Sequence, residues 1–221
     1  MRVLAIDSSF EACSTAILDE GGVRWRELRI IGRGHAEALP VMVAEGLDRS
    51  GLKIADIDRV GVVIGPGAFA GVRVGLAFAR ALCLGTKAVA IGVTSLEALA
   101  ASVDEAGAVA TVFDARRGQV YAALYDADRV QLVAPFVGPP AEAARRVGGR
   151  AARLAGSGAA LVAPHLDRRL PISAVRDIDP AAVARLAMQA ENPAAPPAPL
   201  YLRPPDAIPS ARTGFGDAAV P

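Results

Sequence analysis

The chain has 221 residues, of which 52% are hydrophobic, so it is long and apolar enough to bury a sizeable core as one large domain or two small ones. Its 24 basic and 23 acidic side chains leave a net charge of +1, which excludes a global field that would attract nucleic acid. The 2 cysteines lack the close spacing of a zinc site or a disulfide framework, and this usage is typical of a reducing cytosol.

The first residues predict a small antiparallel sheet. Val3–Ile6 is an apolar run that ends in Asp7, and Ala12–Leu18 and Val23–Ile31 follow as strand candidates, joined by a hairpin turn at Gly21-Gly22. Since no basic segment with a long apolar core opens the chain, we expect no signal peptide. No apolar run reaches the roughly 18 residues that a membrane span needs, so we expect a cytoplasmic protein without membrane contact.

Strands and helices alternate over the rest of the first half. Apolar residues at helical spacing predict the helices, Gly51 is placed to close the first of them, and Thr94 with Glu97 forms a capping box for the last. In chain order the segments are a helix over His35–Ser50, a strand over Val60–Ile64, a helix over Val72–Leu84, a strand over Ala88–Val93 and a helix over Ser95–Ser102. The first half therefore has the order βββαβαβα.

The same pattern restarts in the second half. Ala108–Phe113 ends in Asp114 as Val3–Ile6 ends in Asp7, and a tight turn and an antiparallel strand over Gln119–Tyr125 follow. Further segments are a strand over Arg129–Phe136, a helix over Pro140–Val147, a strand over Ala151–Ala155 and a helix over Pro180–Glu191. This repetition predicts a diverged internal duplication with a shorter second copy.

The duplication divides the chain into an N-terminal lobe over 1–104 and a smaller C-terminal lobe over 105–203. Prolines crowd after Asn192. This composition cannot form a core, so we expect an extended strap and then a disordered tail over 204–221.

A glycine-rich segment, Gly65–Gly75, joins the strand Val60–Ile64 to the following helix. A strand, a glycine-rich turn and a helix N-terminus can together bind phosphate, because free N–H groups and the helix dipole favour anions. The alternative is a tight turn in which glycine permits close packing. We favour the alternative, since a glycine-rich turn before a helix is a weak signal by itself.

Two aspartates at strand ends are weak candidates for nucleotide binding. Asp7 could hold a magnesium-bound nucleotide while Ser8 and Ser9 contact phosphate, or it could cap its own turn. Asp114 has the same two interpretations, and for this residue we favour a solvated hairpin tip.

The histidines do not indicate a metal site. His35 opens the first helix, and Leu39 occupies the position four residues on, where a second ligand would lie on the same face. His165 lies between Pro164 and Leu166 in what we expect to be a loop. We therefore expect no metal.

Two helices carry more apolar surface than one core needs, which favours a protein partner. Small residues on the second helix allow another helix to approach closely. The interface residues that we expect are His35, Leu39, Met42 and Val43 on the helix over 35–50, and Val74, Ala77, Phe78 and Ala81 on the helix over 72–84. The alternative is that both helices are sandwiched inside the domain.

Five segments, taken in order, resemble one protein family. They are Ile6–Ser14, Gly34–Pro40, Gly65–Gly75, Asp114–Tyr121 and Pro199–Arg203. The family is TsaB, which takes part in making threonylcarbamoyladenosine in tRNA. The resemblance implies an α/β, two-lobed actin-like ATPase (ribonuclease H-like) fold, shared with sugar kinases and Hsp70. The chain departs from the family at Ala68 and Ala70, where Ser and Thr are usual, so two hydroxyls that might meet a phosphate are absent.

The resemblance also implies a non-catalytic subunit that scaffolds a TsaD-like transferase, together with a TsaE-like ATPase, during modification of an anticodon-loop adenosine. We accordingly expect no catalytic residue and no cofactor. We expect the chain to contact tRNA only indirectly and to form a homodimer when alone, through the two apolar helices. Two enzymes remain as alternatives. One is an ATP-dependent phosphotransferase of the same fold that uses Asp7 and Asp114, and the other is a metallopeptidase, which the missing histidine pair disfavours.

Overall fold

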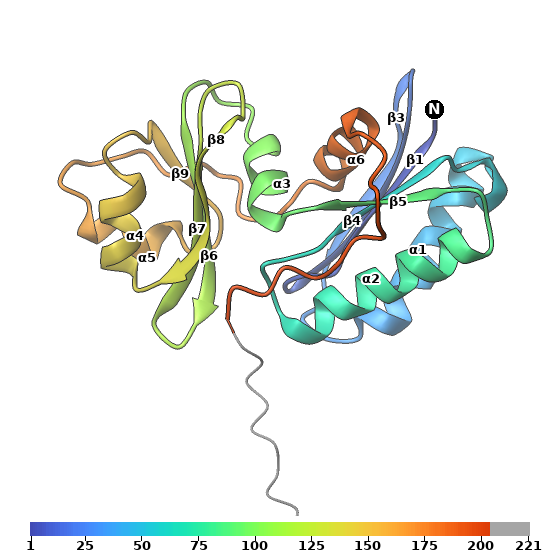
Figure 1. Ribbon diagram of the computed structural model, residues 1–221, viewed down its shortest axis with the longest axis horizontal. Helices are drawn as coiled ribbons and strands as arrows, with labels where there is room; N and C mark the ends of the chain where they lie inside the picture. Colours follow the sequence, from blue (N-terminus) through green and yellow to red (C-terminus); the bar gives the residue numbers. More distant parts are fainter. Residues whose placement is uncertain (204–221) are drawn as a thin grey trace, which may run out of the picture.

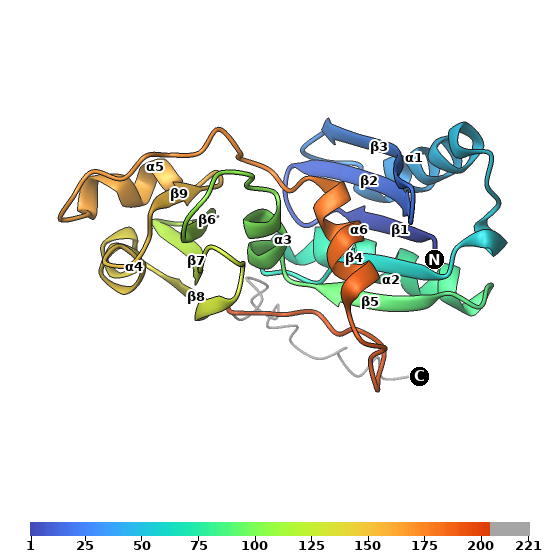
Figure 2. The same cartoon turned by 90° about the horizontal axis from the view of Figure 1, so that it is seen from above.

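Two β-sheets stand side by side in the computed structural model, which describes residues 1–203 (Figure 1). Helix α3 (Ser95–Ala101) lies between the two sheets, and helix α6 (Pro180–Gln189) lies across the first sheet when the molecule is seen from above (Figure 2). None of the helices within 1–203 is long and apolar enough to span a membrane. The tail expected over 204–221 lies outside the described residues.

The first sheet has the strand order β3-β2-β1-β4-β5. Its strands are β1 (Val3–Asp7), β2 (Ala12–Asp19), β3 (Gly22–Ile30), β4 (Arg59–Val63) and β5 (Val89–Val93). β1 pairs antiparallel with β2 and parallel with β4. Every residue of β1 is buried, because helices α1 (His35–Ser50) and α2 (Phe69–Leu84) cover one face of the sheet and α6 covers the other. The central strands are therefore buried along nearly their whole length, whereas exposure alternates along the edge strand β3.

The second sheet repeats this order without a fifth strand, as β8-β7-β6-β9. Its strands are β6 (Val109–Arg116), β7 (Gln119–Tyr125), β8 (Gln131–Gly138) and β9 (Arg153–Ala155). Helices α4 (Pro140–Val147) and α5 (Ala159–Val162) cover its outer face (Figure 1). β6, β7 and β8 thus correspond to β1, β2 and β3, which confirms the predicted duplication and the shorter second copy.

The chain returns to the first sheet after it has completed the second. α6 packs so closely on β4 that a Cβ atom added at Gly61 would lie 2.7 Å from the Cβ atom of Ala187. Residues 191–203, which we call the strap, then run along the same sheet, with Pro197 against Gly92 of β5. Residues 180–200, which we expected in the C-terminal lobe, therefore pack on the sheet of the N-terminal lobe. A boundary at 104/105 stays a prediction.

Below, the first lobe denotes the first sheet with α1, α2 and α6, and the second lobe denotes residues 108–172. The predicted bounds of α1, α4 and β7 are confirmed. The predicted cap of α3 is confirmed too, because the side chain of Thr94 accepts a hydrogen bond from the backbone N–H of Glu97 at 3.2 Å. α2 begins at Phe69 rather than Val72, directly after the extended backbone of Ala68.

Three short elements were not predicted. They are α5 and the 3-10 turns η1 (Ile54–Asp56) and η2 (Ala163–His165), which are too short to show a helical period. His165 consequently ends a 3-10 turn rather than lying in a loop.

Candidate functional site

The first candidate site is the turn after β1, where Asp7 caps the chain's own backbone. Its Oδ1 atom accepts hydrogen bonds from the backbone N–H of Ser9 at 2.8 Å and from the Ser9 hydroxyl at 2.7 Å. The side chain is buried, and this burial raises the pKa of the Asp7 carboxyl, while the two Ser9 hydrogen bonds act in the opposite direction. Of the two interpretations of Asp7, the geometry favours the turn cap.

The glycine-rich segment packs directly on this turn. The Ser8 hydroxyl donates to the carbonyl of Gly71 at 2.9 Å, and the N–H of Ala68 donates to the carbonyl of Ser9 at 2.7 Å. A Cβ atom at Gly67 would lie 2.5 Å from the Ser9 carbonyl oxygen, and one at Gly71 would overlap the Ser8 carbonyl oxygen. These glycines therefore serve the close approach of two backbone segments, which is the alternative that we favoured from the sequence.

A cavity of about 640 Å³ lies between the two lobes. Asp114 lines it, whereas Asp7, Ser8 and Ser9 do not, so the structure does not bring the four weak candidates into one site. The Asp114 carboxylate is held by Arg116, whose backbone N–H donates to it at 2.7 Å and whose guanidinium lies 3.5 Å from it.

Other groups at the cavity connect the lobes instead of presenting a reactive centre. The guanidinium of Arg116 reaches across to the carboxylate of Glu11 at 2.6 Å. The ring of Phe10 stacks on that of Phe113, with 4.1 Å between the centroids. Sequence reasoning missed both contacts, because Phe10 and Glu11 carry no periodic signal and their partners lie in the other half of the chain.

A metal site needs several ligand side chains that lie close together. Within 1–203, no three or more His, Cys, Asp or Glu side chains gather in a way that could hold a metal ion. The imidazole of His35 is half-buried at the start of α1, with its Nε2 atom 3.2 Å from the carbonyl oxygen of Ala12.

The second candidate site is the outer surface of α1 and α2. Leu39, Met42 and Val43 belong to the core beneath α1, with 0%, 0% and 3% of each residue exposed. This burial corrects the expectation that these three side chains face a partner. They sit on the face of α1 that the sheet covers.

The accessible part of this surface comes mainly from α2 and from the other side of α1. Ala77 and Ala81 are exposed, and Val74 and Phe78 are half-buried. Two large apolar side chains that we had not included are also exposed. They are Val41 on α1, at 59%, and Leu84 at the end of α2, at 90%. Leu84 lies three residues after Ala81, and that spacing could have identified it.

Comparisons with known proteins extend these observations. Residues 14–164 match the sequence model of the family described as TsaD, tRNA N6-adenosine threonylcarbamoyltransferase. The chain is 38% identical to the tRNA threonylcarbamoyladenosine biosynthesis protein TsaB of Escherichia coli over 131 residues, which are 58% of this chain and only 56% of that protein. It is 37% identical to the uncharacterized protein Rv3421c of Mycobacterium tuberculosis over 95% of both chains.

Solved structures give the same result for the fold. YeaZ from Pseudomonas aeruginosa superposes with a TM-score of 0.76 at 30% identity, covering 85% of this chain and 90% of that one. A second structure, of an uncharacterized protein from Pseudomonas aeruginosa with similarity to peptidase YeaZ, has a TM-score of 0.77 at 29% identity, covering 91% and 99%. With its duplicated sheets and these relatives, the chain belongs to the TsaB family and has a two-lobed actin-like fold.

Proposed function

We propose that this chain is a non-catalytic subunit of the cytoplasmic machinery that makes threonylcarbamoyladenosine in tRNA. In this role it scaffolds a TsaD-like transferase together with a TsaE-like ATPase. The names of the relatives from Escherichia coli and Bacillus subtilis, both called tRNA threonylcarbamoyladenosine biosynthesis protein TsaB, support the pathway. The match to the TsaD family model supports a relation to the transferase.

The observation that supports the non-catalytic role is that the Asp7 side chain bonds to its own turn. Its carboxylate is buried and bonded to Ser9, and the glycine-rich segment that could cradle a phosphate packs on the carbonyls of Ser8 and Ser9. Ala68 and Ala70 add no hydroxyl. A phosphotransferase of this fold would need these groups to face a ligand, and Asp7 does not line the cavity.

The surface proposed for the transferase is the exposed part of α1 and α2. The side chains of Ala77 and Ala81 are small, so another helix can approach α2 closely, and Val41 and Leu84 would supply apolar area. We propose that the same surface pairs two copies of the chain when no partner is present. A stable interface of this kind buries about 1,200–2,000 Å² in total.

The test is reconstituted tRNA modification with a TsaD-like transferase and a TsaE-like ATPase. Leaving out the chain should abolish the activity, while Asp7→Asn and His35→Ala chains should leave it nearly intact, because a scaffold needs neither group for chemistry. A lost catalytic group would instead lower the rate by about 10²-fold or more. A folded Asp7→Asn chain that still binds the transferase but gives no modification would overturn the scaffold role.

A further inference from the structure

The strap is attached firmly to the first lobe. The guanidinium of Arg80 on α2 donates to the carbonyl of Pro197 at 2.7 Å. Three residues further along, the backbone N–H of Leu200 donates to the carbonyl of Ile64, just after β4, at 2.8 Å. The strap therefore follows the first sheet as an extended segment with a fixed register.

An aromatic and arginine cluster holds the strap at the start of α2. The Nε atom of Arg73 donates to the hydroxyl of Tyr201 at 3.0 Å, and the same guanidinium lies 3.9 Å from the centre of the Phe69 ring. The rings of Phe69 and Tyr201 are 5.0 Å apart. The two aromatic side chains are rigid and lose little entropy when they pack together, and the Arg73 guanidinium contacts both, so the cluster fixes the direction in which the strap leaves the first lobe.

The strap then crosses to the second lobe. The guanidinium of Arg203 donates to the carbonyl of Ala115 at 3.2 Å and to the side-chain oxygen of Gln119 at 3.2 Å. Ala115 lies near the end of β6, and Gln119 starts β7. Leu200–Arg203 also line the cavity between the lobes, so the strap bridges the lobes beside that cavity.

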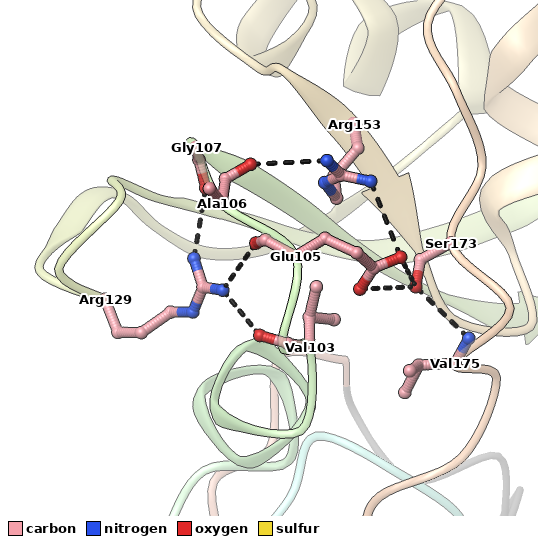
Figure 3. A network of polar contacts seen from close by, with 8 residues as sticks. All are labelled: Val103, Glu105, Ala106, Gly107, Arg129, Arg153, Ser173 and Val175. Carbon is pink, nitrogen blue, oxygen red and sulfur yellow. Dashed lines mark hydrogen bonds and ion pairs between the residues drawn. The ribbon is translucent and has the colours of Figure 1, made fainter.

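The chain itself crosses between the lobes at a different place (Figure 3). The two crossings, around 103–107 and 173–175, meet where the Ser173 hydroxyl donates to the carboxylate of Glu105 at 3.0 Å. Arg153 of β9 lies 3.5 Å from that carboxylate, and Arg129 donates to the carbonyl of Glu105 at 3.1 Å. Both crossings are thus tied together at one edge of the second lobe, which is the arrangement of a hinge.

The hinge and the strap contact lie at opposite ends of one strand. Glu105 precedes the start of β6 at Val109, whereas Arg203 contacts Ala115 near its end. At about 3.3 Å per residue, the two ends are roughly 20 Å apart. We infer that the strap is a latch, which holds the two lobes closed over the cavity from the side opposite the hinge.

Other contacts beside the cavity also join the two lobes. The ion pair of Glu11 and Arg116 is solvent-exposed on both sides and contributes little. The stack of Phe10 on Phe113 adds apolar contact and belongs to a buried cluster that includes residues of both sheets, so the latch acts together with this core.

The test measures the distance between the lobes in solution. Spin labels are placed on Ala55→Cys in the first lobe and Ala160→Cys in the second, both exposed, in a Cys83→Ser chain whose Cys13 is buried. Pulsed electron resonance then gives the distribution of distances. Arg203→Ala removes the latch from the strap side and Gln119→Ala weakens it from the second lobe. Arg169→Ala, at an exposed position outside the latch, is the matched control.

We expect a single narrow distribution in the wild type and in Arg169→Ala. Loss of a charge-assisted hydrogen bond should raise the population of longer distances roughly tenfold in Arg203→Ala, with a smaller rise in Gln119→Ala. A folded Arg203→Ala chain with the wild-type distribution would overturn the inference. If Arg203→Ala does not fold, the distance distribution of Gln119→Ala is the test. An unchanged distribution in that variant would equally overturn the inference of a latch.

Discussion

Gly71 lies where the glycine-rich segment packs on the turn after β1. Its φ angle is not in the left-handed region, unlike that of Gly65 at 104°, so backbone conformation does not require glycine there. The requirement comes from the carbonyl of Ser8, which occupies the space of a Cβ atom. A glycine of this kind reports a close backbone contact, and the sequence alone cannot say what is on the other side.

We predict that Gly71→Ala destabilises the fold by about 3 kcal/mol or more, because the added methyl must displace backbone rather than a flexible side chain. Gly149→Ala is the control, since nothing lies within 4 Å of a Cβ atom there. Urea denaturation of both variants gives the comparison. Equal urea midpoints for the two variants would contradict this prediction, because they would mean that the glycine-rich segment can move away from the Ser8 carbonyl without loss of stability.

Asp7 should make the stability of the protein depend on pH in an unusual direction. Burial raises the pKa of its carboxyl above the ordinary value of 3.8, so the folded state favours the neutral form. The stabilising effect of this group is complete below that ordinary value and is lost as the pH rises through the folded-state pKa. Asp7→Asn keeps an oxygen acceptor for Ser9 and cannot ionise.

The melting temperature of Asp7→Asn, relative to the wild type, should therefore increase as the pH is raised from about 4 to about 7. Thermal melts of both chains at a series of pH values measure the difference. A difference that stays constant over this range would mean that Asp7 ionises as easily in the folded chain as in the unfolded one.

At the scale of elements, the sequence pattern predicts that α1 and α2 are helices but not which of their faces is buried. Helical spacing predicted both helices and the bounds of α1, because apolar residues and a closing glycine are local signals. It could not say which apolar face is core, since both sides of α1 carry apolar residues. Leu39 and Met42 proved to face the sheet, while Val41 is exposed. Only the position of the neighbouring strands decides between them.

We predict that Ala81→Glu gives a folded monomer, because a charge on the exposed side of α2 would be buried without a partner in any interface formed there. Ala160 is an exposed alanine on α5, so Ala160→Glu is the control and should sediment as the wild type does. Sedimentation velocity at high protein concentration measures both. A wild-type chain that is monomeric and does not bind a TsaD-like transferase would remove the case for this interface.

At the scale of the whole molecule, the repeated order of strands and turns predicted the duplication, and the resemblance to the TsaB family implied the two-lobed actin-like fold. It did not show that α6 would cover the sheet of the first lobe. The pattern of α6 fixes a helix with buried alanines and Val183, but contains nothing about which sheet those residues meet. The cavity escaped prediction for the same reason, because its walls come from both lobes and the strap.

We predict that Mg-ATP binds the isolated chain weakly or not at all, even though the cavity is large enough for a ligand of ordinary size. The Asp7 carboxylate is engaged by Ser9, and Asp114 is held by Arg116. Isothermal calorimetry measures the affinity and the stoichiometry. Tight, stoichiometric binding of Mg-ATP, together with release of phosphate by the pure chain, would favour the phosphotransferase instead.

The return of α6 to the first sheet has a consequence for synthesis on the ribosome. The strands of the second sheet are contiguous in sequence between 109 and 155, so that sheet can form as soon as its own residues have emerged. The first sheet emerges earlier, yet one of its faces stays uncovered until 180–189 are made. The portion of the chain translated first is thus completed last, and in the interval its apolar face is open to chaperones.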